Sequence, residues 1–262
     1  MEHNEIASIA RMLHRARKVV VFTGAGISTE SGIPDFRSPG GIWSRYNADD
    51  LTYQKFRSSE HYRRIYWKYD RERYPAMRDA APNEAHHAIV EIEKAGKLSA
   101  LVTQNIDGLH AKAGNSREKI LELHGTVHEV VCVDCGMRWP REEITDFMDR
   151  EGVDVPYCDQ CDGPLKCATI AFGQTLPQEI LAQSFAMAGQ CDVLITVGSS
   201  LVVQPANMLP LEASRKGAKL ALINMTPTVY DSIMDVIALG SAGAIMSSVM
   251  KEFRQLTQSS SG

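Results

Sequence analysis

The hydrophobic pattern of the chain alternates between helical and extended periods. Four short apolar runs have the length of buried strands, the first of them a β-branched run, and helical patterns lie between them. The expected strands are 19–22, 98–102, 192–197 and 219–223, and the clearest helical patterns are 6–17, 86–95 and 176–189. Strands that alternate with helices predict an α/β fold with a doubly wound, parallel, Rossmann-like sheet.

Polar or glycine-rich residues come directly after each expected strand. A glycine turn at 24–26 follows the first strand, and the polar stretch 103–107 begins at the end of the second. Residues 198–200 follow the third strand and Asn224 follows the fourth. Because ligands of doubly wound sheets bind beyond the carboxyl ends of the strands, these residues predict a ligand site at that edge.

Two segments interrupt the alternation. Residues 34–82 are irregular, aromatic and charged, with a helical pattern at 58–77, and they predict a cofactor loop and a helical module. Residues 126–165 contain one helical pattern and too little apolar material for a core of their own. We therefore expect a nucleotide-binding domain from residues 1–125 and 166–256 that carries the 34–82 module, a zinc-ribbon-like insertion at 126–165, and a flexible tail at 257–262.

The insertion contains two Cys-x-x-Cys pairs, which together form a candidate metal site. Each pair can present two sulfurs to one tetrahedral ion, and the spacing between the pairs is slightly longer than in common zinc ribbons. All four thiols are used and no position is left for water, so a structural zinc ion fits better than a catalytic one. Scattered buried cysteines would not explain the paired spacing. The expected ligands are Cys132, Cys135, Cys158 and Cys161.

Charge and composition exclude several classes of function. The 262 residues carry a net charge of −4, so no general basic field is available to hold nucleic acid or an anionic membrane. No apolar run approaches the roughly 18 residues of a membrane span. Six cysteines, four of them in metal spacing, fit a reducing compartment better than a disulfide framework. We therefore expect a soluble, cytoplasmic protein without a direct nucleic-acid or membrane partner.

The glycine turn after the first strand has two readings. Small side chains at 24–26 would let backbone N–H groups and the N-terminus of a following helix face a diphosphate. The turn lacks the third glycine of the usual dinucleotide fingerprint, and the chain has no Gly-Lys-Ser/Thr of a P-loop. Taken alone, the turn is explained equally well by a structural role.

A series of longer motifs favours a cofactor-binding role for the turn. They occur in order from about residue 6 to residue 245, and comprise 24–28, 32–37, 103–110, 123–125, the four cysteines, 172–173, 176–177, 198–203, Pro205 and 223–224. With these motifs the chain resembles the sirtuins, NAD-dependent protein-lysine deacetylases, of the bacterial or archaeal type. The resemblance implies that an acyl-lysine carbonyl attacks the ribose C1′ of NAD as nicotinamide leaves, and that a base then activates the 2′-hydroxyl. The products would be free lysine, nicotinamide and O-acyl-ADP-ribose.

The resemblance also implies roles for individual residues. His124 would be the base, and a neutral imidazole suits that task near pH 7. Asn105 and Asp107 would bind the nicotinamide end, Gln104 would reach the ribose hydroxyls, and His110 would be structural. Phe36 would screen the reactive ribose from water. The positions that match the family's NAD site are Gly24, Ala25, Gly26, Ile27, Asp35, Phe36, Arg37, Gln104, Asn105, Ile106, Asp107, Gly198, Ser199, Ser200 and Asn224.

The expected partners are acetyl-lysine proteins or peptides, bound as an added strand in a cleft. The acyl pocket would be apolar, and the substrate positions are Ile170, Phe172, Gly173, Val202, Val203, Tyr66 and Tyr69. Relatives that remove acidic acyl groups have a Tyr-x-x-Arg pair, whereas this chain has Tyr66-Trp67-Lys68-Tyr69, so acetyl is the simplest substrate and other short acyl groups stay open. Gln174, Cys167 and Ala171 also depart from the family pattern beside this cleft.

Two other functions remain as alternatives. A protein mono-ADP-ribosyltransferase would share the NAD site but transfer ADP-ribose to a protein nucleophile. A zinc-ribbon module that binds nucleic acid would use the sheet only as a scaffold, but the net charge of −4 argues against it.

Overall fold

The structure is a computed structural model that describes residues 2–34 and 47–259. Asp35, Phe36 and Arg37, which the sequence assigns to the cofactor loop, lie outside the described residues. No helix in the described part of the chain is long and apolar enough to cross a membrane.

The large lobe is built around a six-stranded, fully parallel sheet in the order β3-β2-β1-β7-β8-β9. Its strands are β1 (Val19–Thr23), β2 (Leu98–Thr103), β3 (Ile120–Glu122), β7 (Val193–Val197), β8 (Lys219–Asn224) and β9 (Val236–Leu239). The predicted α/β class and the doubly wound parallel sheet are confirmed. The hydrophobic pattern does not predict the two edge strands, β3 and β9.

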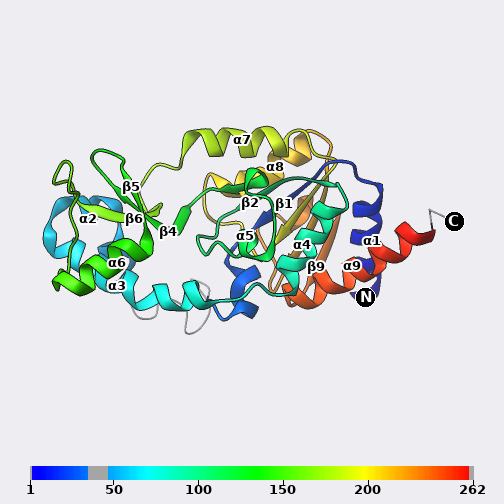
Figure 1. The fold of residues 1–262 in the computed structure, drawn as a ribbon. Coiled ribbons are helices and arrows are strands. Elements are labelled where there is room, and N and C mark those ends of the chain that lie inside the picture. The colour runs from blue at the N-terminus through cyan, green and yellow to red at the C-terminus, as the bar shows by residue number, and fades with distance from the viewer. Residues whose placement is uncertain (1, 35–46, 260–262) are drawn as a thin grey trace.

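Helices cover both faces of this sheet (Figure 1). One face carries α1 (Glu2–Arg15), α4 (Glu84–Lys94) and α9 (Ala242–Ser259), and the other carries α7 (Gln178–Ala188) and α8 (Leu209–Arg215). Side chains of β1 alternate between the two cores, since Val19 and Val21 belong to the first and Val20 and Phe22 to the second. The central strand is therefore buried on both faces, as its apolar run predicts.

The small lobe lies at one end of the large lobe (Figure 1). It has an antiparallel sheet in the order β5-β4-β6, formed by β4 (Gly125–Cys132), β5 (Arg138–Pro140) and β6 (Leu165–Thr169). Its helices are α2 (Tyr53–Ser58), α3 (Glu60–Asp79) and α6 (Arg141–Glu151). The sequence predicts two separate insertions, but in the structure they share one core. Trp67 of α3 is fully buried there and its indole N–H donates to the Leu165 carbonyl at 3.0 Å.

A buried ionic cluster also joins the two insertions. The Asp70 carboxylate pairs with Arg141 and, at 3.2 Å, with Arg73. Burial alone would raise the pKa of Asp70, but the two guanidinium groups hold it below its ordinary value. Cys167, one of the residues that depart from the family pattern, contacts both Asp70 and Arg141, and burial raises its pKa to about 12.

The remaining elements are short. They are α5 (Leu109–Ala113) and the 3₁₀ helices η1 (Ala25–Ser31), η3 (Ala48–Leu51), η4 (Arg117–Lys119), η5 (Ala206–Met208) and η6 (Asp231–Ile233). Helix α9 reaches Ser259, so residues 257–259 of the predicted flexible tail are helical, and the rest of that tail lies outside the described residues.

Candidate active site

The carboxyl ends of β1, β2, β7 and β8 bring the predicted cofactor residues to one edge of the sheet. The Gly24 N–H donates to the Val197 carbonyl at 3.1 Å, and the Gly26 N–H donates to the Gly198 carbonyl at 2.8 Å. A Cβ atom on Gly24 would lie 2.8 Å from the Gly198 oxygen, and Gly198 itself has φ +64°. The glycines are therefore required for close packing of two backbone segments, whatever ligand they also face.

The segment after this turn differs from the expected helix. Residues Ala25–Ser31 form the 3₁₀ helix η1 instead of a full α-helix. The Glu30 carboxylate anchors this segment to the beginning of α9, where it accepts hydrogen bonds from the Ser241 hydroxyl at 2.7 Å and the Gly243 N–H at 2.8 Å. The segment is thus held in place by tertiary contacts from outside the motif.

Ser28, Asn105 and Asp107 form a buried polar network beside the turn. The Ser28 hydroxyl donates to the Asp107 carboxylate at 2.8 Å and accepts from the Asn105 side-chain amide at 3.0 Å. The other Asp107 oxygen accepts from the Leu109 N–H at 3.0 Å. Burial raises the pKa of Asp107. The structure thus brings the predicted Asn105 and Asp107 together and adds Ser28, a buried polar residue within a motif that was read only for its glycines.

His124 lies in the turn directly before β4, and one of its ring nitrogens has a fixed hydrogen-bond partner. Its Nδ1 lies 2.9 Å from the Gln104 carbonyl oxygen. Since a carbonyl only accepts, Nδ1 must carry the proton, and the lone pair of the neutral ring is on Nε2. Burial lowers the pKa of His124, so the ring is neutral near pH 7. The geometry therefore presents an unprotonated nitrogen, as a general base requires.

The other predicted cofactor residues differ in exposure, and two of them already make hydrogen bonds within the protein. The Gln104 amide, which we expected to reach ribose hydroxyls, donates to the Ser199 hydroxyl at 2.8 Å. The Asn224 amide donates to the Thr226 carbonyl at 2.7 Å. Ser200 is exposed, and Ile106 packs partly buried against a small apolar cluster. His110 is fully enclosed with its Nε2 3.0 Å from the Thr23 hydroxyl, in keeping with a structural role.

Residues of the predicted peptide cleft include two exposed apolar side chains. Phe172 is 49% exposed and Val202 is 48% exposed, while Ile170 and Val203 are half-buried. The Ile170 N–H donates to the His124 carbonyl at 2.8 Å, which places this strand end beside the candidate base.

Two backbone acceptors in this cleft already have partners. The Phe172 carbonyl accepts from the Tyr53 N–H at 2.9 Å, and the Gly173 carbonyl accepts from the Gln54 side chain at 3.0 Å. Both donors belong to α2, so a docked peptide must share these carbonyls with α2 or displace its contacts.

Tyr66 and Tyr69, predicted for the acyl pocket, are both buried in the core of the small lobe. The Tyr66 ring meets Phe56 edge-on at 5.0 Å between centroids. Its hydroxyl has no hydrogen bond of good geometry among the described residues. Burial raises the pKa of this hydroxyl, and the neighbouring Thr169 side chain opposes part of that rise. Tyr69 packs under the Arg73 guanidinium at 4.7 Å, so its place in a pocket for substrate is not supported.

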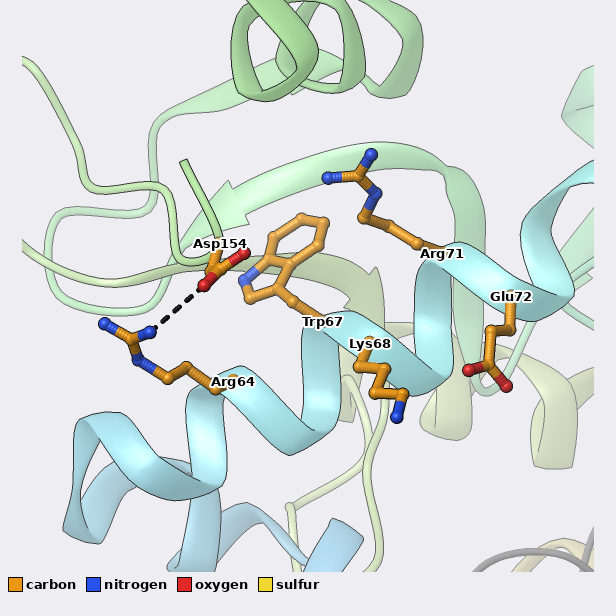
Figure 2. Close-up of a pocket in the computed structure, with 6 residues that line it drawn as sticks. All are labelled: Arg64, Trp67, Lys68, Arg71, Glu72 and Asp154. Carbon is orange, nitrogen blue, oxygen red and sulfur yellow. Dashed lines mark hydrogen bonds and ion pairs between the residues drawn. The ribbon is translucent and has the colours of Figure 1, made fainter. Parts of the chain in front are cut away.

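A pocket of about 450 Å³ lies on the outer surface of α3, and Figure 2 shows its lining. Two of its basic groups are paired, Arg64 with Asp154 at 3.0 Å and Arg71 with Asp149. Lys68 and Arg71 line this pocket and not the site around His124, so neither supplies the cation that an acidic acyl group would need. The lining residues are Arg64, Trp67, Lys68, Arg71, Glu72 and Asp154, none of which is a predicted site residue.

The four predicted metal ligands form one cluster in the small lobe. All four sulfurs lie within 4.8 Å of one another, with 3.5 Å between Cys132 and Cys161 and 3.7 Å between Cys135 and Cys158. A tetrahedral zinc ion with Zn–S bonds of about 2.3 Å requires sulfur separations of about 3.8 Å. The donor set and its spacing fit a structural zinc ion, as predicted.

Known proteins resemble this chain over nearly its whole length. The model of the Sir2 family matches residues 24–205. An NAD-dependent protein deacetylase of Thermodesulfovibrio yellowstonii is 40% identical over 248 residues, 95% of each chain. NAD-dependent protein deacylase 2 of Archaeoglobus fulgidus is 39% identical and covers 97% of this chain and 98% of its own.

Solved structures agree with these relatives. A Sir2 structure with a deacetylated p53 peptide and 3′-O-acetyl-ADP-ribose has a TM-score of 0.87 at 35% identity, and covers 96% of this chain and 98% of its own. A Sir2 structure with a propionylated peptide has a TM-score of 0.84 at 35% identity, with coverage of 94% and 97%.

Proposed function

Since the chain belongs to the Sir2 family, we propose that it removes acetyl groups from protein lysines with NAD as co-substrate, yielding nicotinamide and O-acetyl-ADP-ribose. The names of its relatives and the peptide and acetyl-ADP-ribose complex of a Sir2 neighbour support this activity. The single observation that carries the proposal is His124, whose Nδ1–H is bound to the Gln104 carbonyl so that Nε2 is left as the base.

The NAD site would occupy the polar edge of the sheet. The backbone of residues 24–27 and the side chains of Ser199, Ser200 and Asn224 would bind the diphosphate and the adenosine ribose. Asn105 and Asp107 would bind the carboxamide, because the Asn105 carbonyl and the Asp107 carboxylate each keep acceptor capacity beyond the bonds they make within the protein. When bound, NAD supplies the ADP-ribosyl group that accepts the acyl group.

His124 would take a proton from a ribose hydroxyl through Nε2. Its lowered pKa keeps the ring in the basic form at pH 7, and the hydrogen bond to Gln104 fixes the direction of the lone pair. The charge that forms on the ring is partly balanced by the Gln104 carbonyl dipole, because Nδ1–H becomes a stronger donor when the ring is protonated.

For the acyl group, we propose acetyl and short apolar chains as substrates. A carboxylate that enters this region must lose its hydration, which is costly unless a free cation receives it. Arg73 of α3, which lies over the ring of Tyr69, is already paired with Asp70 at 3.2 Å. We expect a higher kcat/KM for acetyl-lysine than for succinyl-lysine on the same peptide, and the reverse order would overturn this part of the proposal.

We also propose a nucleotide-binding domain at 1–125 and 166–256 with a zinc-binding insertion at 126–165, as expected from the sequence, and a cytoplasmic location. The division is amended in two places, because α2 and α3 of the 34–82 module pack with the insertion and α9 continues to residue 259. The division is supported by the parallel sheet of the large lobe and the separate antiparallel sheet of the small lobe. The location is supported by the four clustered thiols, which must stay reduced to bind zinc. Fractionation of cells that express the protein would test the location.

One experiment tests the main proposal. Purified protein is incubated with NAD and an acetyl-lysine peptide, and the products are followed by mass spectrometry. Deacetylated peptide and O-acetyl-ADP-ribose in equal amounts are expected. Labelling of protein by ADP-ribose without deacetylation would instead indicate a mono-ADP-ribosyltransferase, and the absence of any NAD-dependent product would refute both activities.

A further inference from the structure

Strand β4 and the residue just before it, His124, bind three carbonyl oxygens of the loop that carries Asn105 and Asp107. The pairs are His124 Nδ1 with Gln104 O at 2.9 Å, Val127 N with Ile106 O at 3.0 Å, and His128 Nε2 with Asp107 O at 2.8 Å. Two of the three donors are imidazole rings. One belongs to the candidate base, and the other, His128, has no part in the proposed chemistry.

The hydrogen bond and the packing of the His128 ring fix its place. Because its partner is a carbonyl, Nε2 must carry a proton. The ring lies so close to Gly108 that a Cβ atom there would be 2.8 Å from Nε2, and Gly108 has φ +69°. On another side the Tyr74 ring meets it edge-on at 6.4 Å between centroids. The ring therefore fills the space that a side chain at position 108 would need.

This contact fixes the one part of Asp107 that the buried network leaves free. Its two carboxylate oxygens are held by Ser28 and by the Leu109 N–H. The second contact closes a turn across the peptide group between residues 107 and 108, but neither contact binds the carbonyl oxygen of that group. His128 binds the carbonyl of that peptide group. If the bond were lost, the 107–108 peptide group would have one restraint fewer beside a glycine that tolerates many conformations, so the loop and the carboxylate it carries would be held less firmly.

We propose that His128 is a positioning residue for the nicotinamide end of the site, which acts through the Asp107 backbone and touches no substrate. The inference rests on the proposed NAD-dependent function. With this role for His128, strand β4 connects the nicotinamide end of the NAD site to the metal cluster of the small lobe, because the strand ends at the zinc ligand Cys132.

Two substitutions separate the hydrogen bond from the packing. His128→Phe keeps an aromatic ring against Tyr74 but has no N–H, whereas His128→Gln can place an amide N–H where Nε2 stands. NAD and ADP-ribose are each titrated calorimetrically into wild type and variants, with thermal melting as a control for folding. ADP-ribose lacks the nicotinamide group, so it reports the rest of the site.

His128→Phe is expected to weaken NAD binding by about three- to tenfold, the usual effect of one hydrogen bond, while ADP-ribose binding is unchanged. His128→Gln should bind NAD like wild type. Unchanged NAD affinity in His128→Phe, an equal loss for both ligands, or no recovery in His128→Gln would each overturn the inference. A wild type that binds neither ligand would instead overturn the proposed function, and the inference with it.

Discussion

Replacement of His124 by asparagine tests the candidate base while preserving its contact. The amide nitrogen of the introduced side chain would stand near the position of Nδ1, so it can still donate to the Gln104 carbonyl, which is 2.9 Å from Nδ1 in the structure. The substitution removes Nε2 and its lone pair. His124→Ala serves as the matched variant that removes both the base and the hydrogen bond.

The expected magnitudes separate these two contributions. A general base contributes about 100- to 10,000-fold in rate, so His124→Asn should lower kcat/KM for deacetylation by at least about 100-fold. The hydrogen bond to Gln104 contributes about 0.5–1.5 kcal/mol, equivalent to about tenfold at most. Loss of the contact alone therefore cannot explain a drop of two orders of magnitude, and His124→Ala should be only slightly worse than His124→Asn.

The pH dependence adds a second test. Burial lowers the pKa of His124, so Nε2 gains its proton only below the ordinary histidine range of about 6.5. Wild-type kcat/KM should fall as the pH drops through that lowered pKa, and this acid limb should be missing from His124→Asn. Rates on an acetyl peptide from about pH 5 to 9, with NAD affinity measured in parallel, provide the assay. Turnover within about tenfold of wild type in His124→Asn would show that the base lies elsewhere.

Three further predictions concern the stability of the fold. Cys132→Ser should release zinc and lower the melting temperature, as measured by metal analysis and calorimetry, whereas Cys191→Ser, outside the cluster, should keep its metal. Burial lowers the pKa of His86 to about 4 and the pKa of His110 well below 6.5. Because both histidines bind protons more readily in the unfolded chain, the free energy of unfolding should fall between pH 7 and pH 5, by about 2 kcal/mol from His86 alone. A free energy of unfolding in urea that does not change over this pH range would contradict the prediction. Asp70→Asn should cost about 3 kcal/mol or more in urea unfolding, because it leaves the buried Arg141 and the partly buried Arg73 without their carboxylate partner. A loss under about 1 kcal/mol would indicate that the ion pairs are not formed in solution.

The sequence identifies the central strands well because each is a short, mainly apolar run buried on both faces. The edge strands are different. β3 has only three residues, and β9 is partly exposed, so neither has a period that separates it from a loop. Local sequence patterns also cannot predict the shared core of the small lobe, because the contact between Trp67 and Leu165 joins segments that are 98 residues apart.

The site residues divide in the same way. Motif order identifies His124, Asn105 and Asp107, and the structure brings all three to one edge of the sheet. Ser28 and His128 were missed because each works through a hydrogen bond to a residue distant in sequence. The one sequence signal for His128 is that it lies four residues after His124, close to the motif at 123–125. Tyr69 is the reverse case, because the motif comparison selects it for the acyl pocket but the structure buries it in the core of the small lobe.

The long sequence separation within the small lobe has a consequence for synthesis on the ribosome. Helix α3 emerges well before β6, and the partner of the Trp67 indole is made 98 residues later. At the usual rate of about 5–20 residues per second, the delay is about 5 to 20 s. Through that interval the apolar face of α3 has no β6 to cover it, which makes it a natural target for chaperones that hold nascent chains. Proteolysis of chains stalled before Leu165 should therefore cut within α3, and the same site should become resistant once residues 165–169 have left the exit tunnel.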